Sequence, residues 1–242
     1  MGLKAILGKF FNKYLFNAEW KCLSCGAEIF GDKAFCEKCY NELPFNDGYI
    51  CQHCGRKVIA AENYCSTCKG KLLSMDKGRS VFNYDKPIST MIKQLKYYNK
   101  RYLVDYFAKE LSLCYLKNYF NADYITYVPM TKRSKAKRGY NQSQLLAKAL
   151  SERVGVPLYD GLIKVKETKR QATLNRAQRL ENLKQAFKVE DKKLLKEKTV
   201  VLVDDVTTTG STAEVICERL KKAGATNVYL LTVASLPPID KY

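Results

Sequence analysis

Short apolar runs alternate with longer amphipathic stretches over the part of the chain that begins at Leu72. Short apolar runs are typical of buried strands, whereas apolar residues spaced three and four apart are typical of helices. We expect strands at 80–84, 123–129, 199–203 and 227–233, and helices at 87–97, 102–120, 142–154 and 211–223. This alternation predicts an α/β fold in which a mainly parallel sheet carries helices on both faces.

The first 71 residues have a different character. Apolar residues at helical spacing predict an amphipathic helix over 1–19, which could dock on the protein or lie on a membrane surface. Residues 20–71 are rich in cysteine and poor in apolar side chains, so we expect a small separate module there and the α/β domain over 72–242. No apolar run approaches the ~20 residues of a transmembrane helix, and no signal peptide is apparent, so we expect a cytoplasmic protein.

Eight of the ten cysteines form four Cys-x-x-Cys pairs. Adding 29 to the numbers of the first four gives the second four, which indicates an internal duplication. A turn across two residues directs two thiolates at one metal ion, and two such turns complete the tetrahedron that zinc prefers. Gly26 and Gly55 each follow a pair, where we expect a positive φ. The pattern predicts two structural zinc ions held by Cys22, Cys25, Cys36, Cys39, Cys51, Cys54, Cys65 and Cys68.

Other interpretations of the cysteines remain open at this point. Four pairs can combine in three ways, of which the sequential grouping is the simplest because each repeat then closes on itself. A disulfide framework fits poorly with a chain that shows no export signal. We expect His53 to be a spacer between two ligands, and Cys114 and Cys217 to be small buried residues of helices.

Positive charge is concentrated in one region. The formal net charge of +18 falls to about +14 when each zinc site is counted as −2, from 2 − 4. Between Thr131 and Lys184 there are 14 Lys and Arg against 4 Asp and Glu, a net of +10. This indicates an anionic partner such as phosphate, pyrophosphate or nucleic acid, although a solvated lysine-rich surface is the plain alternative. The stretch 164–186, which overlaps the end of this region, is polar and is expected to be a long functional loop.

The stretch from Thr199 to Thr212, TVVLVDDVTTTGST, carries the most specific chemistry. An apolar strand ends in Asp204 and Asp205, whose carboxylates suit the vicinal hydroxyls of a ribose. A turn rich in hydroxyl groups then opens a helix, and backbone N–H groups at a helix N-terminus bind anions. The pattern therefore predicts a ribose 5-phosphate site with its phosphate on Thr208, Thr209, Gly210, Ser211 and Thr212.

Two alternatives compete with this interpretation. An apolar strand that ends in acids could be a Walker B segment, but the chain has no Gly-x-x-x-x-Gly-Lys-Ser/Thr loop to accompany it. The stretch could also be a core strand followed by a capped helix with no ligand.

Three blocks of the chain resemble a known family. The 199–212 stretch resembles the phosphoribosyl-pyrophosphate signature of type I phosphoribosyltransferases. The block from Val128 to Ser143, which contains RGYNQS, and the block from Gln171 to Phe187 are similar to segments of the competence protein F (ComF/GntX) family. The cysteine repeats match that family's double zinc ribbon, so the resemblance runs from Cys22 to Ala234.

The resemblance implies a type I phosphoribosyltransferase-like sheet with flanking helices, preceded by a double zinc ribbon. It implies that Asp204 and Asp205 bind the ribose hydroxyls of phosphoribosyl pyrophosphate and that 208–212 bind its 5-phosphate. Lys132, Arg133 and Arg138 would face the pyrophosphate, residues 165–185 would form a hood, and Mg²⁺ would bridge pyrophosphate and diol.

The resemblance also implies a role in single-stranded DNA handling during competence, with a DNA-uptake helicase or other competence proteins as partners. The alternative is an active phosphoribosyltransferase in nucleotide metabolism, for which no base-recognition segment or general base is apparent; whether the protein is an enzyme stays open. Tyr97, Tyr98, Tyr102 and Tyr140 lie among basic residues and could stack on bases, although such tyrosines are more often part of the core.

Overall fold

The computed structural model describes residues 21–31, 33–58, 62–71, 73–118, 120–167, 183 and 185–236. The helix predicted over 1–19 and most of the hood predicted over 165–185 lie outside these residues. Among the described helices, none is both long and apolar enough to cross a bilayer.

The chain divides into two compact units, Met1–Leu43 and Pro44–Tyr242. The first unit holds one cysteine repeat and the short helix α2, Glu37–Asn41. The second unit holds the other cysteine repeat together with the whole sheet. The boundaries predicted from composition, 20–71 and 72–242, remain a prediction.

A parallel four-stranded sheet forms the centre of the second unit, in the order β1-β6-β5-β2. The strands span Lys77–Asn83 (β1), Tyr124–Tyr127 (β2), Thr199–Thr207 (β5) and Asn227–Ser235 (β6). β5 and β6 lie in the middle and are almost wholly buried, which explains their near-continuous apolar sequences. The α/β fold predicted from the sequence is confirmed.

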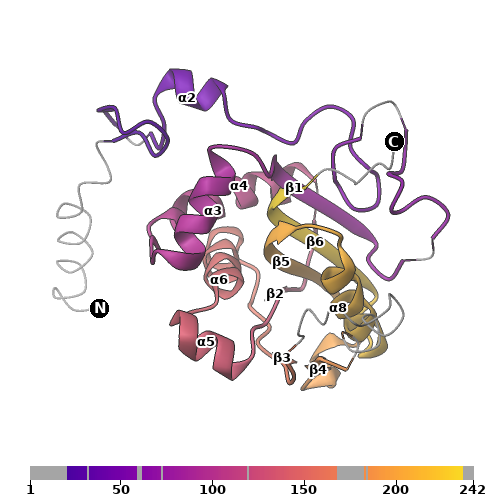
Figure 1. The fold of residues 1–242 in the computed structure, drawn as a ribbon. Coiled ribbons are helices and arrows are strands. Elements are labelled where there is room, and N and C mark those ends of the chain that lie inside the picture. Colours follow the sequence, from indigo (N-terminus) through magenta and orange to yellow (C-terminus); the bar gives the residue numbers. More distant parts are fainter. Residues whose placement is uncertain are drawn as a thin grey trace, which may run out of the picture. The chain divides into compact units, whose positions relative to one another are not determined.

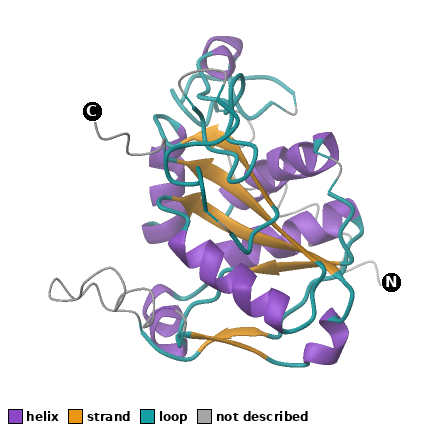
Figure 2. Ribbon diagram, turned by 90° about the vertical axis from the view of Figure 1, so that its right-hand side faces the viewer, coloured by secondary structure: helices purple, strands orange, loops and turns teal. Residues whose placement is uncertain are grey.

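Helices cover both faces of this sheet (Figures 1 and 2). The helices α3 (Ile88–Tyr97), α4 (Leu103–Lys117) and α6 (Gln142–Val154) lie on one side, and α8 (Ser211–Lys222) lies on the other. Each has an apolar stripe at helical spacing, and the residues of that stripe are buried, as Leu95 of α3 and Ile216 of α8 illustrate.

Besides shifts of one to three residues at the ends of several elements, such as β1 and α4, the structure differs from the predicted elements in three places. β5 continues four residues beyond its apolar run to Thr207, because backbone pairing with β6 does not depend on side-chain polarity and Asp204 pairs with Thr232. The helix α5 (Lys132–Arg138) lies between the strand predicted at 123–129 and the helix predicted at 142–154, where no element was expected. The segment expected to be one long loop is bounded by a small antiparallel sheet of β3 (Leu162–Lys164) and β4 (Phe187–Val189), followed by the 3₁₀ helix η2 (Lys192–Leu195).

The second cysteine repeat packs directly on the sheet domain. A Cβ added to Gly55 would lie 2.3 Å from the carbonyl oxygen of Gly78 in β1, so the two backbones touch. The N–H of Gly78 donates to the carbonyl of His53 at 2.5 Å, and Asn46 Nδ2 donates to the carbonyl of Gly55 at 2.6 Å. The four cysteines share a buried apolar cluster with α8 residues such as Ile216 and Leu220.

Candidate functional site

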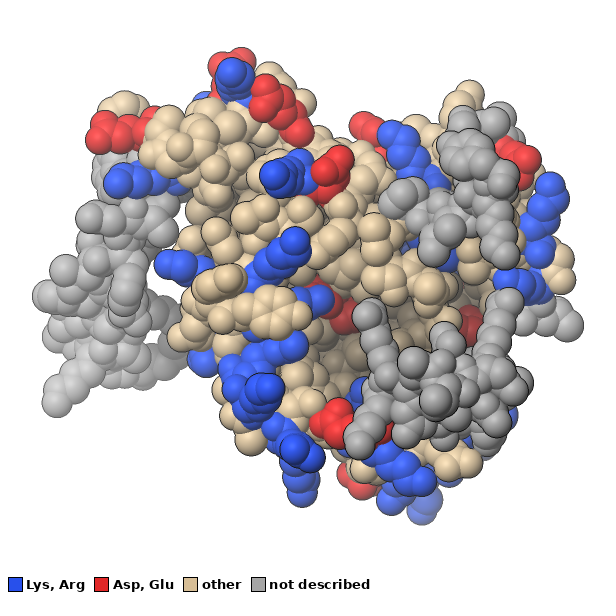
Figure 3. All heavy atoms as spheres, viewed as in Figure 1, with Lys and Arg blue, Asp and Glu red and all other residues tan. Residues whose placement is uncertain are grey.

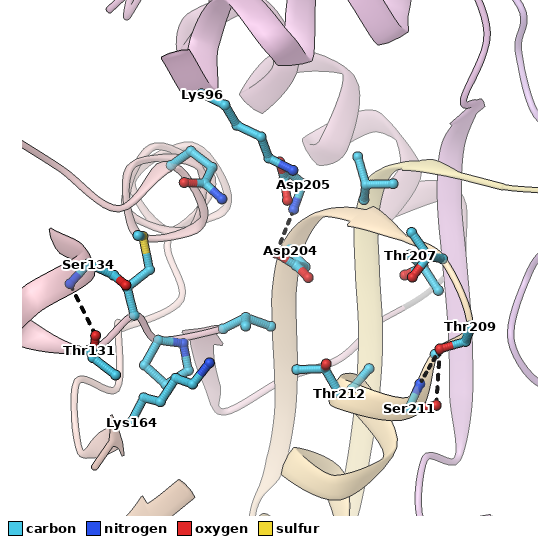
Figure 4. A pocket seen from close by; sticks show the side chains of 18 of the residues that line it. Lys96, Thr131, Ser134, Lys164, Asp204, Asp205, Thr207, Thr209, Ser211 and Thr212 are labelled. Atoms are coloured by element: carbon cyan, nitrogen blue, oxygen red, sulfur yellow. Dashed lines mark hydrogen bonds and ion pairs between the residues drawn. The ribbon is translucent and has the colours of Figure 1, made fainter. Parts of the chain in front are cut away.

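A pocket of about 330 Å³ opens beyond the carboxyl ends of β2 and β5 (Figure 4). Crevices outside the carboxyl ends of strands are where open α/β sheets bind ligands. One wall is the loop after β2 with the start of α5, and the opposite wall is the turn between β5 and α8. The residues predicted to bind the ligand, 204, 205 and 208–212, all line this pocket.

The two carboxylates at the end of β5 have different surroundings. Asp204 accepts a hydrogen bond from Ser143 Oγ at 2.7 Å and is partly exposed in the pocket. Asp205 is only 3% exposed, and its Oδ2 lies 2.5 Å from the Nζ atom of Lys96, which reaches down from α3 (Figure 4). The ribose-hydroxyl role of both acids remains a prediction; Asp204 is open to the pocket, whereas Asp205 is engaged by the partly buried Lys96.

Burial and charge shift the protonation of this group. Burial, together with the negative charge of Asp205, raises the pKa of Asp204 to about 7. Burial alone would lower the pKa of Lys96, but the Asp205 carboxylate outweighs burial and raises it. Lys96 is therefore a fixed cation at the pocket wall, and Asp204 is the carboxyl group that titrates near neutral pH.

The turn between β5 and α8 brings a glycine with a positive φ and two hydroxyl groups to the N-terminus of α8. Gly210 precedes the helix with a φ of +78°, a conformation that glycine adopts at little cost. The Thr209 and Ser211 hydroxyl groups lie 3.0 Å apart, and the Ser211 N–H points to Thr209 Oγ1 at 3.4 Å. Nothing lies within 4 Å of a Cβ added to Gly210, so the positive φ, rather than crowding by protein atoms, is what requires glycine.

The cations predicted to face pyrophosphate divide into two groups. Arg138 lines the pocket, with its guanidinium 2.6 Å from Gln142 Oε1. Lys132 and Arg133 are exposed on α5 and do not line it, because α5 turns their side chains to solvent. Lys164 of β3 lines it instead, and burial lowers its pKa. Sequence patterns could not find Lys96 and Lys164, because each reaches the pocket through tertiary contacts rather than from a motif.

The loop after β2 is connected to the start of the predicted hood. Thr131 caps α5 by accepting from the N–H of Ser134 at 3.1 Å. The hydroxyl groups of Thr131 and Ser134 both donate to Glu167, the Ser134 bond being 2.6 Å long. These hydrogen bonds lower the pKa of Glu167 and keep it ionised at the mouth of the pocket.

The cysteines form two clusters that follow the sequential grouping predicted as simplest. One contains Cys22, Cys25, Cys36 and Cys39, the other Cys51, Cys54, Cys65 and Cys68. In each cluster the four sulfur atoms lie within 4.8 Å of one another, and the Cys54–Cys65 and Cys25–Cys36 sulfur separations are 3.7 and 3.9 Å. A tetrahedron of Zn–S bonds of about 2.3 Å has edges of about 3.8 Å, so both clusters fit zinc. The positive φ predicted at Gly26 and Gly55 is confirmed at +75° and +70°.

Three smaller predictions can also be compared with the structure. Cys217 is fully buried and Cys114 is partly buried. Tyr97, Tyr98 and Tyr102 are exposed, at 68%, 69% and 48%. Tyr140 is buried instead, and its hydroxyl donates to the carbonyl of Leu95.

The protein-family matches and the curated relatives agree with this architecture. The phosphoribosyl transferase domain family matches residues 141–239, and the double zinc ribbon domain family matches 13–69. Competence protein F of Haemophilus influenzae is 32% identical over 168 residues, which are 66% of this chain and 73% of that protein. DNA utilization protein YhgH of Escherichia coli (strain K12) is 33% identical over 159 residues, 62% of this chain and 67% of that protein. The solved glutamine phosphoribosylpyrophosphate amidotransferase from B. subtilis matches with a TM-score of 0.40 and 26% identity, over 54% of this chain and 26% of that one.

Fold and site together define a type I phosphoribosyltransferase-like protein with a double zinc ribbon that contains two four-cysteine sites. The chain belongs to the competence protein F (ComF) family.

Proposed function

We propose that the pocket binds phosphoribosyl pyrophosphate with Mg²⁺ and that the protein handles single-stranded DNA during DNA uptake. The main support for this ligand is the order of groups along one wall of the pocket. A carboxyl group lies at the end of β5, and a turn with N–H and hydroxyl donors follows at the N-terminus of α8. The names of the relatives, a competence protein and a DNA utilization protein, support the role in DNA uptake.

Each part of the ligand has a matching group in the pocket. The 5-phosphate would be bound by the N–H and hydroxyl groups of 208–212, and the ribose hydroxyls would donate to Asp204. Lys96, Arg138 and Lys164 would face the pyrophosphate, whose negative charge requires preorganised cations. Mg²⁺ would be held mainly by the ligand's own oxygens, as this ion commonly is in phosphate sites.

Replacing Asp204 by Asn tests the ligand assignment. The carboxylate is lost while the shape of the side chain is kept, and a hydrogen bond to a charged group contributes roughly 1.5–3 kcal/mol. Calorimetric titration of phosphoribosyl pyrophosphate with Mg²⁺ should therefore show an affinity about ten- to a hundredfold weaker. Asp105→Asn is the matched control, because Asp105 is an exposed acid paired with Arg153 on the surface. If wild-type protein binds no ligand, or if both variants bind as wild type does, the assignment is wrong.

The pKa of Asp204 adds a pH test to the same variant. Since this pKa is about 7, the carboxylate form accumulates as pH rises from 6 to 8, and wild-type affinity should increase over that range. The ratio of wild-type affinity to Asp204→Asn affinity should also grow with pH, because only wild type gains a carboxylate there. Titration of the ligand phosphate affects both proteins equally and cancels in this ratio. The raised pKa also means that ionising Asp204 destabilises the free folded protein, so Asp204→Asn should gain stability relative to wild type as pH rises toward 7.

The surface beside the pocket supports the second half of the proposal. Lys and Arg side chains gather beside the hollow, over α3 and α5 (Figure 3). Tyr97, the last residue of α3, is exposed and has the Arg138 guanidinium 5.4 Å from its ring centroid. Arg138 also lines the pocket. Cations that contact phosphates and rings that stack on bases are the two elements of single-strand binding without sequence preference. A strand on this surface would therefore pass the mouth of the pocket.

Charge reversal on α5 tests DNA binding. Each phosphate contact to a single strand contributes about −0.7 to the slope of log K against log salt, so Lys135→Glu/Lys137→Glu should reduce the slope by about 1.4. Lys193→Glu/Lys196→Glu makes the same change of charge at exposed lysines near η2 and serves as control. Fluorescence anisotropy with a labelled oligonucleotide measures both. Equal slopes for the two variants, or no binding of wild type at low salt, would remove DNA from this surface.

The alternative function, an active phosphoribosyltransferase, is favoured by the three cations that could stabilise departing pyrophosphate. In that reaction an acceptor attacks C1 of the ribose, the C1–O bond breaks, and pyrophosphate leaves with the bonding electrons. Release of pyrophosphate from the wild-type protein with any of a panel of nucleobases would support it, and binding without release would leave the DNA-handling function.

A further inference from the structure

A buried arginine joins the second cysteine cluster to the phosphate-binding turn. Arg56 is only 3% exposed. Its Nε lies 3.4 Å from the sulfur of Cys54, and its two outer nitrogens donate to the backbone carbonyls of Thr208 at 2.8 Å and Thr209 at 3.5 Å. Arg56 therefore lies behind the turn that forms one wall of the pocket, on the side away from the ligand.

The location of Arg56 is explained by charge. A buried guanidinium is costly unless it is paired, and a zinc ion with four thiolates carries a net charge of −2. The thiolate of Cys54 thus compensates the arginine, and the arginine keeps its remaining donors for the carbonyl groups of the turn. Cluster and turn are parts of one hydrogen-bonded unit.

The contact determines which way two peptide groups face. In a trans peptide the N–H points opposite to the carbonyl of the same unit. Since the carbonyls of Thr208 and Thr209 point at Arg56, the N–H groups of Thr209 and Gly210 point away from it. Thr209 and Gly210 line the pocket, so these donors are the ones an anion would meet there.

The chain is held in place both beside Arg56 and just after the ribbon. Next to Arg56, the backbone of Gly55 touches Gly78 of β1. In the segment that follows the ribbon, the N–H groups of Ser74 and Met75 donate to Glu214 in the first turn of α8, the second at 3.4 Å. The backbone at Arg56 is therefore held in place, so that its guanidinium can orient the turn.

We propose that Arg56 is a positioning residue for phosphate binding, and that the second cysteine cluster is part of the ligand site through it. This rests on the proposed function, because it assigns a cause to the affinity of the turn for the 5-phosphate. The 5-phosphate would contact the peptide groups that Arg56 orients, and not Arg56 or the cluster itself.

The test uses the full-length protein loaded with zinc, and it compares Arg56→Met with Arg56→Lys. Methionine fills the space without donors, and lysine keeps the charge but loses the fork that reaches two carbonyls. We expect Arg56→Met to bind ribose 5-phosphate at least tenfold more weakly by calorimetry, and Arg56→Lys to fall between it and wild type. Binding of inorganic pyrophosphate, which uses the other wall of the pocket, should change less than twofold.

Arg79→Met is the matched control. Arg79 also donates to the ribbon backbone, at the carbonyl of Gln52, but it makes no contact with the phosphate-binding turn. The control should retain wild-type affinity for ribose 5-phosphate. We expect about two zinc ions per chain in every variant, so metal analysis shows whether weaker binding comes from a misplaced turn or from loss of zinc. If Arg56→Met loses zinc, the affinity of Arg56→Lys for ribose 5-phosphate tests the proposal instead.

Hydrogen exchange makes the result independent of the ligand assignment. Without the guanidinium, the amides of Ser211 and Glu214, which donate to Thr209 Oγ1 and to the Gly210 carbonyl, should exchange faster while those of β5 stay protected. If wild-type protein binds no ribose 5-phosphate, the proposed function fails, whereas unchanged exchange in Arg56→Met overturns the role of Arg56. Wild-type affinity in a zinc-loaded Arg56→Met variant overturns it as well.

Discussion

The two cysteine repeats have the same local backbone structure and different surroundings. In both, the first cysteine N–H donates to the residue five positions on, Cys22 to Ala27 at 2.7 Å and Cys51 to Arg56 at 2.8 Å. In the first repeat Cys25 is exposed, whereas every cysteine of the second repeat is buried, between 0% and 5% exposed. Cysteine spacing therefore determines where metal binds, and the neighbouring residues determine whether the metal site supports anything else.

Two aligned positions account for the difference. Nothing lies within 4 Å of a Cβ added to Gly26, whereas one added to its counterpart Gly55 would lie 2.3 Å from Gly78. The next residue is Ala27 in the first repeat and Arg56, which reaches the phosphate-binding turn, in the second. The second copy of the module thus differs from the first by a close backbone contact and one long side chain.

The largest expected effect comes from removing a zinc ligand. Cys65→Ser should lose about one zinc ion and destabilise the unit Pro44–Tyr242 by on the order of 4 kcal/mol, because its cluster belongs to the core shared with α8. Cys36→Ser should also lose about one ion but leave the unfolding of that unit and ribose 5-phosphate binding unchanged. Metal analysis with scanning calorimetry measures both. Similar losses of stability in the two variants would contradict the distinction between the repeats.

A smaller effect is expected from the paired glycines. Alanine at a positive φ costs about 1–2 kcal/mol, a cost that Gly26→Ala and Gly55→Ala share. Gly55→Ala adds a backbone clash, and overpacking costs typically about 1–3 kcal/mol more. Urea unfolding of the sheet-containing unit should therefore be sensitive to Gly55→Ala and insensitive to Gly26→Ala. An equal response to both would show that the contact with β1 adjusts without cost.

The parts of the molecule that follow from local patterns could be predicted from sequence. Helix α6 was predicted with its observed bounds because its apolar periodicity and flanking residues agree, and the turn at 208–212 was found because strand, acids, glycine and helix are contiguous. The spacing of the four Cys-x-x-Cys pairs predicted both clusters, and the cysteines group in the sequential way that was the simplest of the three.

The parts that depend on tertiary contacts could not be predicted. Helix α5 has no buried residue, so it lacks the periodicity that marks a helix, and its only local signal is Thr131 as N-cap with Gly139 as C-cap. In the sequence, Lys96 cannot be distinguished from the other lysines of an amphipathic helix, because only the tertiary fold brings it to Asp205. Arg56 is separated by 152 positions from the carbonyl to which it donates, and no spacing rule connects them.

The most direct test of the proposed site is a crystal structure of the wild-type protein with phosphoribosyl pyrophosphate and Mg²⁺. We predict that the 5-phosphate binds to the N–H groups of 208–212, that the ribose hydroxyls bind to Asp204, and that Arg56 still donates to the carbonyls of Thr208 and Thr209. A phosphate bound elsewhere, or a pocket that stays without ligand at saturating concentration, would contradict it.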